Sequence, residues 1–201
     1  MAPIHYVRRF TLSVTDGEVS QYRQYLLDSG VRLDQPLMLV GVTAKLASKV
    51  WREENMIWVL RQLMENYPQM QFIFNYAPGT EEQNARRIFQ VLGCPSRILI
   101  DVQAKSAREL FALASFVTLY FGNEGGARHI VHAAGKPSFV ICAPSSNKDV
   151  WLPQDDIPAK GIAVGDVCSP EELSRMTYEQ QYDAITPERV WHDLQQFLSK
   201  I

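Results

Sequence analysis

The sequence has no block of basic residues, no long apolar run and few cysteines. Its 201 residues carry a formal net charge of −2, so it lacks the positive surface that nucleic-acid binding needs, and we expect no nucleic-acid partner. No apolar run reaches the roughly 18 residues of a transmembrane helix, and no signal peptide opens the chain. Cys94, Cys142 and Cys168 are widely spaced, which is typical of reduced thiols in a cytosolic protein and gives no zinc site. We therefore expect a cytoplasmic protein without a transmembrane segment.

Several motifs of common enzyme classes are also missing. The loop after the first predicted strand has no Gly-x-Gly-x-x-Gly, which disfavours a dinucleotide-dependent dehydrogenase. No P-loop and no Gly-x-Ser-x-Gly elbow occur, so neither a P-loop nucleotide site nor a serine hydrolase is supported. No Asp-x-Asp pair offers a seat for a divalent ion on a diphosphate. His129 and His132 are three residues apart, without a third ligand at a usable spacing. We expect no cofactor and no metal.

What the chain does have is a regular alternation of apolar strands and amphipathic helices. Apolar residues make up 46% and charged residues 21%, a composition typical of globular domains. The alternation indicates parallel βαβ units and an open, doubly wound α/β sheet of about six strands. A capping box at Thr15 and Glu18 starts the first helix, so we assign residues 1–14 to a linker and 15–201 to the domain. The predicted strands span residues 36–42, 71–75, 97–102, 116–121 and 161–164, with a further strand before Pro144.

The stretch from Phe116 to Pro144 stands out within this pattern. It is predicted to form a buried strand, a glycine-rich turn, a helix from about residue 125 to Gly135, and a second buried strand. Gly125 and Gly126 bring bare backbone close to whatever lies above the sheet. A helix N-terminus at such a turn offers free N–H groups and a positive dipole end, which suits a phosphate. An ordinary glycine-rich turn is the alternative interpretation.

Other candidate residues follow the first two predicted strands, because ligands of open α/β sheets bind at the carboxyl ends of the strands. Lys49, preceded by Ser48, lies in the loop after the first strand and can meet a phosphate as a point charge. Glu81 and Glu82 open the helix after the second strand and can accept hydrogen bonds from a ribose diol. The alternatives are a solvated surface lysine and acidic residues placed to suit the helix dipole. In addition, His129 lies off the apolar stripe of its helix.

Three segments resemble a known family. Residues 120–137, YFGNEGGARHIVHAAGKP, are similar to the Gly-Asn-Asp-(Ser/Thr)-Gly-x-x-His signature, followed by Ala-x-Gly-x-Pro, of family 9 glycosyltransferases. Residues 48–51, SKVW, resemble the Ser-Lys-x-Trp element of that family, and residues 77–83, APGTEEQ, resemble its Gly-x-x-x-Glu loop. The order and spacing of the three segments also match. The family comprises the ADP-heptose:lipopolysaccharide heptosyltransferases and their relatives.

The resemblance implies a fold and an activity. The family has the GT-B architecture of two facing Rossmann-like domains, and this chain resembles the C-terminal half, which binds the nucleotide-sugar donor. The implied reaction is an inverting transfer to a lipopolysaccharide core acceptor. The catalytic base is expected on a missing N-terminal domain, so no catalytic residue is expected in this chain, and the isolated half is expected to be inactive. The location implied is cytoplasmic, with peripheral association at the inner membrane open to the full-length enzyme.

The resemblance also assigns roles to residues. The diphosphate and sugar of the donor, ADP-heptose or a similar compound, would be bound by Thr43, Ser48, Lys49, Glu124, Gly125, Gly126 and His129. Glu82, with Glu81 as second choice, would bind the ribose. The chain departs from the family at Glu124, where the family has Asp, at Gly125, where it has a hydroxyl residue, and at Arg128, where it usually has an apolar residue. These departures are consistent with a sugar other than heptose.

Two other functions stay open on the sequence. One is another GT-B-like enzyme, such as a UDP-sugar epimerase, which would prefer uridine to adenine nucleotides. The other is a non-catalytic interaction domain whose glycine-rich turn is purely structural. In that case, substitution of Lys49 or His129 would change nothing beyond slight effects on stability.

Overall fold

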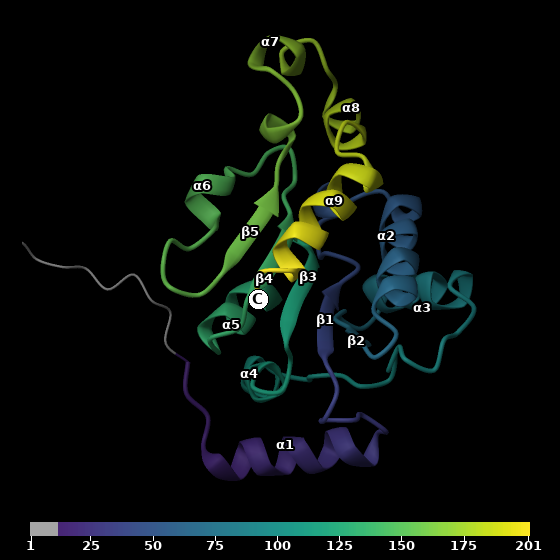
Figure 1. Cartoon of the computed structure of the whole chain (residues 1–201), viewed down its shortest axis with the longest axis vertical. Helices are drawn as coiled ribbons and strands as arrows, with labels where there is room; N and C mark the ends of the chain where they lie inside the picture. The colour runs from purple at the N-terminus through teal and green to yellow at the C-terminus, as the bar shows by residue number, and fades with distance from the viewer. Residues whose placement is uncertain (1–11) are drawn as a thin grey trace, which may run out of the picture.

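Five parallel strands form one sheet at the centre of the molecule (Figure 1). The computed structural model describes residues 12–201. The sheet has the order β2-β1-β3-β4-β5, and every neighbouring pair of strands is parallel. The strands are β1 Leu37–Gly41, β2 Gln71–Phe74, β3 Leu119–Asn123, β4 Ser138–Ile141 and β5 Ala159–Ile162. The predicted α/β class and parallel sheet are therefore confirmed.

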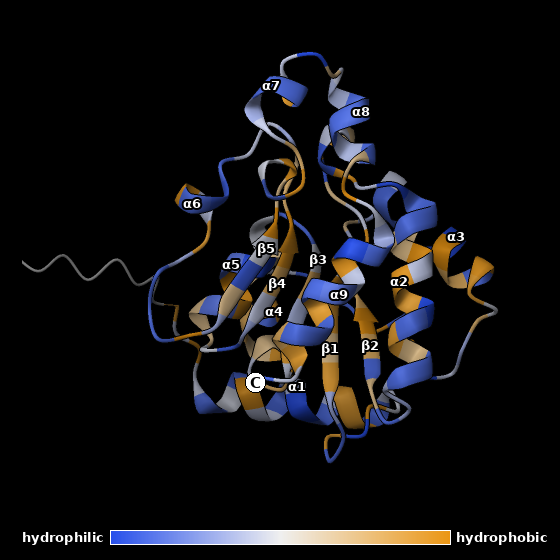
Figure 2. Ribbon diagram, turned by 45° about the horizontal axis from the view of Figure 1, so that its top comes forward, coloured by the Kyte–Doolittle hydropathy of each residue, from blue (hydrophilic) through white to orange (hydrophobic). Residues whose placement is uncertain are grey.

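Helices cover both faces of the sheet, so the central strands are apolar on both sides. Met38 and Val40 of β1 belong to the core under α2, α3 and α9, whereas Leu37 and Leu39 belong to the core under α1, α4 and α5. Figure 2 shows this distribution, with hydrophobic strands inside and hydrophilic outer faces on the helices. The helices are α1 Asp16–Asp28, α2 Glu53–Asn66, α3 Thr80–Val91, α4 Ala107–Ala114, α5 Gly126–Ala133, α6 Lys148–Trp151, α7 Pro170–Leu173, α8 Tyr178–Asp183 and α9 Pro187–Leu198, with 3-10 turns η1 Ala47–Lys49 and η2 Val164–Asp166.

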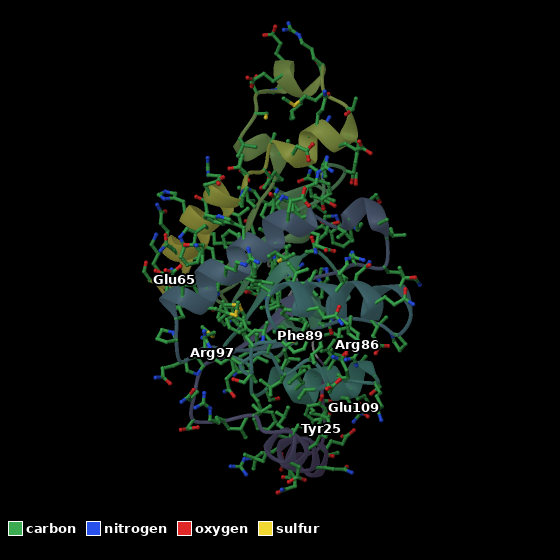
Figure 3. All side chains as sticks on the ribbon, turned by 90° about the vertical axis from the view of Figure 1, so that its right-hand side faces the viewer. Tyr25, Glu65, Arg86, Phe89, Arg97 and Glu109 are labelled. Atoms are coloured by element: carbon green, nitrogen blue, oxygen red, sulfur yellow. The ribbon has the colours of Figure 1, made fainter. Side chains whose placement is uncertain are left out.

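The sixth strand, predicted at residues 97–102, is wrong. Only Ile98 forms an isolated bridge, to Phe72 of β2. The backbone turns on both sides of that bridge, because Ile98 N–H bonds to the Pro95 carbonyl at 2.9 Å and Val102 N–H bonds to the Leu99 carbonyl at 3.2 Å. Arg97 (labelled in Figure 3) donates to carbonyls at the end of α2, which ties this segment to the helix layer. The sheet therefore has five strands among the described residues.

The capping boxes predicted at the helix N-termini are confirmed only in part. At α1 the capping box is confirmed, since Thr15 Oγ1 accepts from Glu18 N–H at 3.2 Å and Glu18 Oε2 accepts from Thr15 N–H at 2.7 Å. The sequence has the same spacing at Thr80 and Gln83, which also predicts a capping box, but this prediction is wrong, because Thr80 is already helical and the N-cap of α3 is Gly79, with φ of +95°. Most of the linker predicted for residues 1–14 lies outside the described residues.

The order of the strands creates a switch point between β1 and β3. The chain leaves β1 toward β2 on one side, and leaves β3 toward β4 on the other. The loops that follow these two neighbouring strands therefore diverge, and a crevice opens at the carboxyl ends, where open α/β sheets bind ligands. Between residues 12 and 201, no helix is long and apolar enough to cross a membrane.

Candidate functional site

Two glycines set the spacing of β1 and β3 at the switch point. Gly41 lies opposite Gly122 in the ladder. Gly122 has φ of +132°, and a Cβ atom added to it would lie 2.5 Å from the Gly41 carbonyl oxygen. A Cβ atom on Gly41 would lie 2.0 Å from the hydroxyl of Tyr120. A side chain at Gly122 would force the two strands apart, and one at Gly41 would displace the ring of Tyr120, so this close approach depends on the two glycines.

Asn123 ties the loop after β1 to the end of β3. Its side chain is buried, its Nδ2 donates to the Gly41 carbonyl at 3.0 Å, and its Oδ1 accepts from the Trp51 N–H at 2.9 Å. The indole of Trp51 donates to the Ile185 carbonyl at 3.0 Å. The segment that carries Lys49 is thus fixed beside the turn after β3. Asn123 was not among the predicted site residues, although it lies inside the glycine-rich motif.

The glycine turn after β3 separates two hollows. The larger has a volume of about 870 Å³ and lies among the loops that follow β1, β2 and β3. The smaller, of about 210 Å³, lies on the α6 side of the turn and includes Arg128, His129 and Trp151. Of the predicted residues, Thr43, Lys49, Glu81, Glu82, Glu124, Gly125 and Gly126 line the larger hollow, whereas Lys49, Glu124, Gly125, Gly126 and His129 line the smaller one. Another hollow, of about 440 Å³, lies between α1 and α4 and contains none of these residues.

The backbone of Gly125 and Gly126 is exposed at this turn. No heavy atom lies within 4 Å of a Cβ atom added to either residue, and the φ of Gly125, 172°, is extended backbone that any residue adopts. The fold therefore does not require glycine here, in contrast to Gly122. α5 begins at Gly126 without a side-chain cap, so the N–H groups of its first turn have no partner within the helix.

Lys49 and Glu124 form an ion pair at the edge of the turn. Lys49 Nζ lies 2.5 Å from Glu124 Oε1, and the side chain of Glu124 is only 11% exposed. Ser146 Oγ donates to the same carboxylate oxygen at 2.5 Å. Ser146 lies in the loop after β4 and was missed by the sequence analysis, because no local pattern shows which side chain reaches Glu124. The carboxylate thus holds Lys49 next to Gly125 and Gly126.

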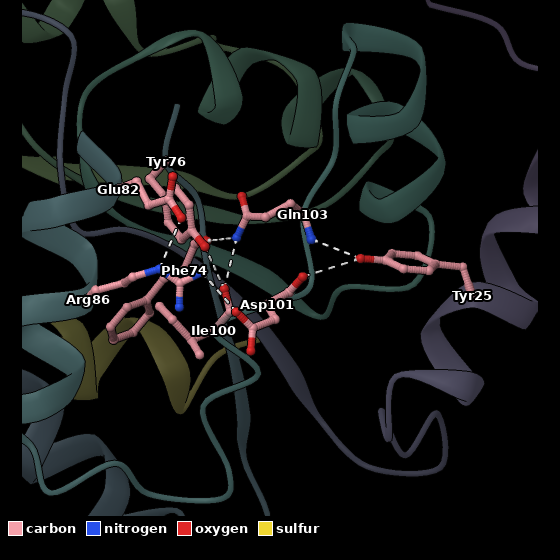
Figure 4. Close-up of polar contacts among 8 residues, drawn as sticks. All are labelled: Tyr25, Phe74, Tyr76, Glu82, Arg86, Ile100, Asp101 and Gln103. Carbon is pink, nitrogen blue, oxygen red and sulfur yellow. Dashed lines mark hydrogen bonds and ion pairs between the residues drawn. The ribbon is translucent and has the colours of Figure 1, made fainter. Parts of the chain in front are cut away.

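The first turn of α3 forms the opposite wall of the larger hollow. Thr43 Oγ1 donates to Glu81 Oε2 at 3.1 Å, so the buried hydroxyl of Thr43 orients that carboxylate. Glu82 Oε1 accepts from Arg86 Nε at 3.0 Å, and Arg86 also donates to Asp101 at 2.9 Å (Figure 4). Both acidic side chains thus lie at the hollow and are held by neighbouring groups.

A hydrogen-bond network behind Glu82 fixes the floor of the same hollow (Figure 4). The amide of Gln103 donates to the carbonyls of Phe74, at 3.1 Å, and Ile100, at 3.2 Å. Tyr76 donates its hydroxyl to the Ile100 carbonyl at 2.7 Å. Tyr25 of α1 accepts from the Gln103 N–H at 3.2 Å, which links the network to the opposite helix layer. The segment after residue 100 is therefore fixed although it forms no strand.

Arg128 and His129 line the smaller hollow from α5. Arg128 is 3% exposed, and its guanidinium donates to the Trp151 carbonyl and lies 3.0 Å from His129 Nδ1. Burial lowers the pKa of Arg128, and burial together with the nearby guanidinium charge lowers the pKa of His129 to about 4. His129 is therefore neutral at pH 7. Its ring meets the Trp151 indole edge-on, with ring centroids 5.8 Å apart.

Ser48 is the one predicted site residue that the structure does not bring to these hollows. It is exposed and lies in a different depression, with Arg52 and Tyr178. The hydroxyl of Tyr178 donates to the Ser48 carbonyl at 2.6 Å. The 3-10 turn η1 is the reason, because it directs Ser48 toward α8 while Lys49 faces the glycine turn.

Metal-binding side chains do not gather at the site. In the part of the chain that the structure describes, no group of three or more His, Cys, Asp or Glu residues could hold a metal ion. His132 is buried, and its Nε2 lies 2.9 Å from Asp155 Oδ2.

The fold is similar to that of solved glycosyltransferases and an epimerase. No protein-family model and no curated protein sequence matches the chain. A family 9 glycosyl transferase from Veillonella parvula DSM 2008 superposes with a TM-score of 0.74 at 16% identity, covering 96% of this chain and 54% of its own. ADP-heptose lps heptosyltransferase II of E. coli gives 0.67 at 18% identity, covering 94% and 54%. UDP-GlcNAc 2-epimerase of Methanocaldococcus jannaschii gives 0.50 at 15% identity, covering 90% and 50%.

These similarities establish a shared fold. The chain spans about half the length of each of the three proteins. Its α/β fold therefore corresponds to one half of their GT-B-type architecture.

Proposed function

We propose that this chain binds the nucleotide-sugar donor of an inverting glycosyltransferase that resembles lipopolysaccharide heptosyltransferases. The observation that carries the proposal is the bare backbone of Gly125 and Gly126 at the start of α5, between two hollows and beside Lys49. Free N–H groups, a helix N-terminus and a lysine together form a site for a diphosphate.

In this proposal the two hollows bind different parts of the donor. The larger, of about 870 Å³, lies within the roughly 300–1,000 Å³ range of small-molecule sites and takes the nucleoside. Glu82 and Glu81 lie on its wall and accept hydrogen bonds from the ribose hydroxyls. The smaller hollow, of about 210 Å³, takes the sugar next to His129. The diphosphate then lies over Gly125 and Gly126, where Lys49 balances its charge.

The proposed reaction uses this half to stabilise the leaving group. A base on the opposite domain removes the proton from an acceptor hydroxyl. The acceptor oxygen bonds to the anomeric carbon as the bond from that carbon to the phosphate oxygen breaks. The nucleoside diphosphate leaves with the bonding electrons, and the α5 N-terminus and Lys49 stabilise its added charge. In the proposed full-length enzyme the acceptor is a lipopolysaccharide core, and the enzyme works in the cytoplasm, at the inner membrane.

Exposed apolar side chains near the site support a facing domain. Leu46 is 56% exposed, Val150 72%, Trp151 52% and Tyr178 36%. All four belong to segments at or beyond the carboxyl edge of the sheet, on the same side of the molecule as the two hollows. Large exposed apolar side chains around a site are typical of surfaces that contact another protein domain. The heptosyltransferase that this fold matches is about twice as long, which is consistent with a second half on that side.

Calorimetric titration of the 201-residue chain with ADP and UDP tests the proposal. We expect a nucleoside diphosphate to bind, and Lys49→Met to weaken binding about tenfold or more, as loss of a charge-assisted hydrogen bond does. Lys200→Met, at the exposed C-terminal end, serves as the control and should bind like the parent chain. The absence of any heat of binding for both nucleotides at millimolar concentration would overturn the proposal and favour an interaction domain.

The same titration weighs the second candidate, a UDP-sugar epimerase. The observation in its favour is the shared fold with UDP-GlcNAc 2-epimerase, at a TM-score of 0.50. An epimerase should bind UDP more tightly than ADP. A heptosyltransferase-like protein should show the opposite preference, so the ratio of the two dissociation constants separates the candidates.

A further inference from the structure

The smaller hollow contains a buried cation without an acidic partner. Arg128 is 3% exposed, yet among residues 12–201 no carboxylate forms an ion pair with it. The carboxylate that acts on its charge is that of Glu124, which already accepts from Lys49 and Ser146. Burying an uncompensated charge is costly unless an anion or several hydrogen bonds balance it. The site therefore has a positive charge that the described chain leaves unbalanced.

Apart from the Lys49–Glu124 ion pair, the titratable groups that line the hollow around the guanidinium are neutral. His129 has a pKa lowered to about 4, so its ring carries no charge at pH 7. Burial raises the pKa of the Cys142 thiol to about 12, so it stays protonated. The protein acceptors of Arg128 are both neutral, the Trp151 carbonyl and a ring nitrogen of His129. A planar guanidinium in this setting is suited to bind a carboxylate through two parallel hydrogen bonds.

The position of Arg128 points to the sugar of the donor. Arg128 follows Gly125 by three residues, about one turn of α5, and lines the hollow that continues from the glycine turn on the side away from Glu81 and Glu82. With a diphosphate over the turn and the nucleoside in the larger hollow, the sugar is the part of the donor that reaches the guanidinium.

We propose that the donor sugar carries a carboxylate, as in a uronic acid, and that Arg128 binds it. The inference rests on the proposed function and adds the chemical class of the sugar. A neutral sugar in this hollow would leave the buried charge without a counter-ion, whereas a carboxylate would balance it. Arg128 is thus a residue that determines donor specificity.

Matched pairs of donors test the inference. UDP-glucose and UDP-glucuronic acid differ only at C6, which is a hydroxymethyl group in one and a carboxylate in the other. UDP-galactose and UDP-galacturonic acid form a second pair. If the chain prefers adenine, ADP-glucose and its C6-oxidised derivative take their place. We expect the acidic member of at least one pair to bind about tenfold or more tightly, the effect of a charge-assisted bidentate contact.

Two variants assign the preference to the guanidinium. Arg128→Met should remove the tenfold preference while leaving the affinities for the nucleoside diphosphate and for the neutral donor within about twofold of the parent values. Arg175→Met, which removes an exposed arginine just after α7, should leave the preference intact. Circular dichroism checks that both variants are folded.

Each outcome decides between the alternatives. Equal binding of the acidic and neutral members in the parent chain overturns the inference, even if Arg128→Met does not fold. An equal loss of affinity for ADP or UDP and for both sugars in Arg128→Met would show that Arg128 serves the diphosphate, and would also overturn it. Failure of the nucleoside diphosphates themselves to bind refutes the proposed function, and the inference falls with it.

Discussion

Gly122 at the end of β3 and Gly125 in the turn that follows are glycine for different physical reasons, and substitution of each by alanine distinguishes them. Gly122→Ala places a Cβ atom 2.5 Å from the Gly41 carbonyl oxygen and 2.8 Å from two more backbone atoms of that residue, at a φ of +132°. The backbone conformation costs about 1–2 kcal/mol for a residue with a Cβ. Forcing β1 and β3 apart costs about 1–3 kcal/mol more, as overpacking does. The free energy of unfolding should therefore fall by roughly 2–5 kcal/mol, a large part of the about 5–15 kcal/mol typical of a domain.

Gly125→Ala should behave differently. An added Cβ meets no heavy atom within 4 Å, and the backbone is extended. The free energy of unfolding should stay within about 1 kcal/mol of the parent value, or rise by about 0.4–1 kcal/mol because the unfolded chain loses conformational freedom. Binding of the nucleoside diphosphate should nevertheless weaken about tenfold or more, since the methyl group occupies the space nearest the phosphate and displaces a charge-assisted hydrogen bond.

Urea unfolding and calorimetric titration of the same two variants give both quantities. A Gly122→Ala chain as stable as the parent would refute the account of the switch point. A Gly125→Ala chain that loses as much stability as Gly122→Ala would show that the turn is merely structural. Unchanged nucleotide affinity in a folded Gly125→Ala chain would remove the glycine turn from the site.

Two further predictions concern the residues beside the turn. Asn123→Ala leaves the buried Gly41 carbonyl and Trp51 N–H without partners, so the free energy of unfolding should fall by about 2–5 kcal/mol in urea titrations. As a control, Asn55→Ala on α2 should change the free energy of unfolding by less than about 0.5 kcal/mol. A loss below about 1 kcal/mol for Asn123→Ala would contradict the inference that Asn123 holds the loop after β1 against the end of β3. His129 has a pKa of about 4 in the folded chain against the ordinary value of 6.5, so between these two pH values it binds fewer protons than in the unfolded chain. Stability should therefore decrease as pH falls from 6.5 to 4, and His129→Gln should flatten this dependence. An NMR titration midpoint of His129 near 6.5 would contradict the burial described here.

Helix starts and strands were predictable where the signal is local. The reciprocal hydrogen bonds of Thr15 and Glu18 need only three residues of spacing, so the sequence contains them completely. The segment 97–102 was mistaken for a strand because its apolar run is the same in a strand and in a buried loop. Its partners decided the outcome, since turns after Pro95 and Leu99 allow only Ile98 to pair with β2.

The site divides in the same way. The proximity of Lys49 to the glycine turn was predictable, because loops at the carboxyl ends of strands that neighbour at a switch point converge. The pairing of Lys49 with Glu124, 75 residues later in the sequence, was not. Nor was the support from Ser146, which comes from a third loop. The hydrogen bonds of Asn123 to Gly41 and Trp51 join segments far apart in the chain, and no local pattern specifies such contacts.

The sequence by itself determined the parallel α/β architecture and the glycine turn that opens α5, because hydrophobic period and turn chemistry act over a few residues. Only the tertiary structure decided that Gly122 must be glycine whereas Gly125 need not be, since the difference is the approach of β1. The burial of Arg128 was likewise decided only by the tertiary structure, because α6 packs against it and the Trp151 carbonyl accepts from its guanidinium. Burial and proximity depend on segments distant in the sequence, and these segments decide which charges at the site remain available to a ligand.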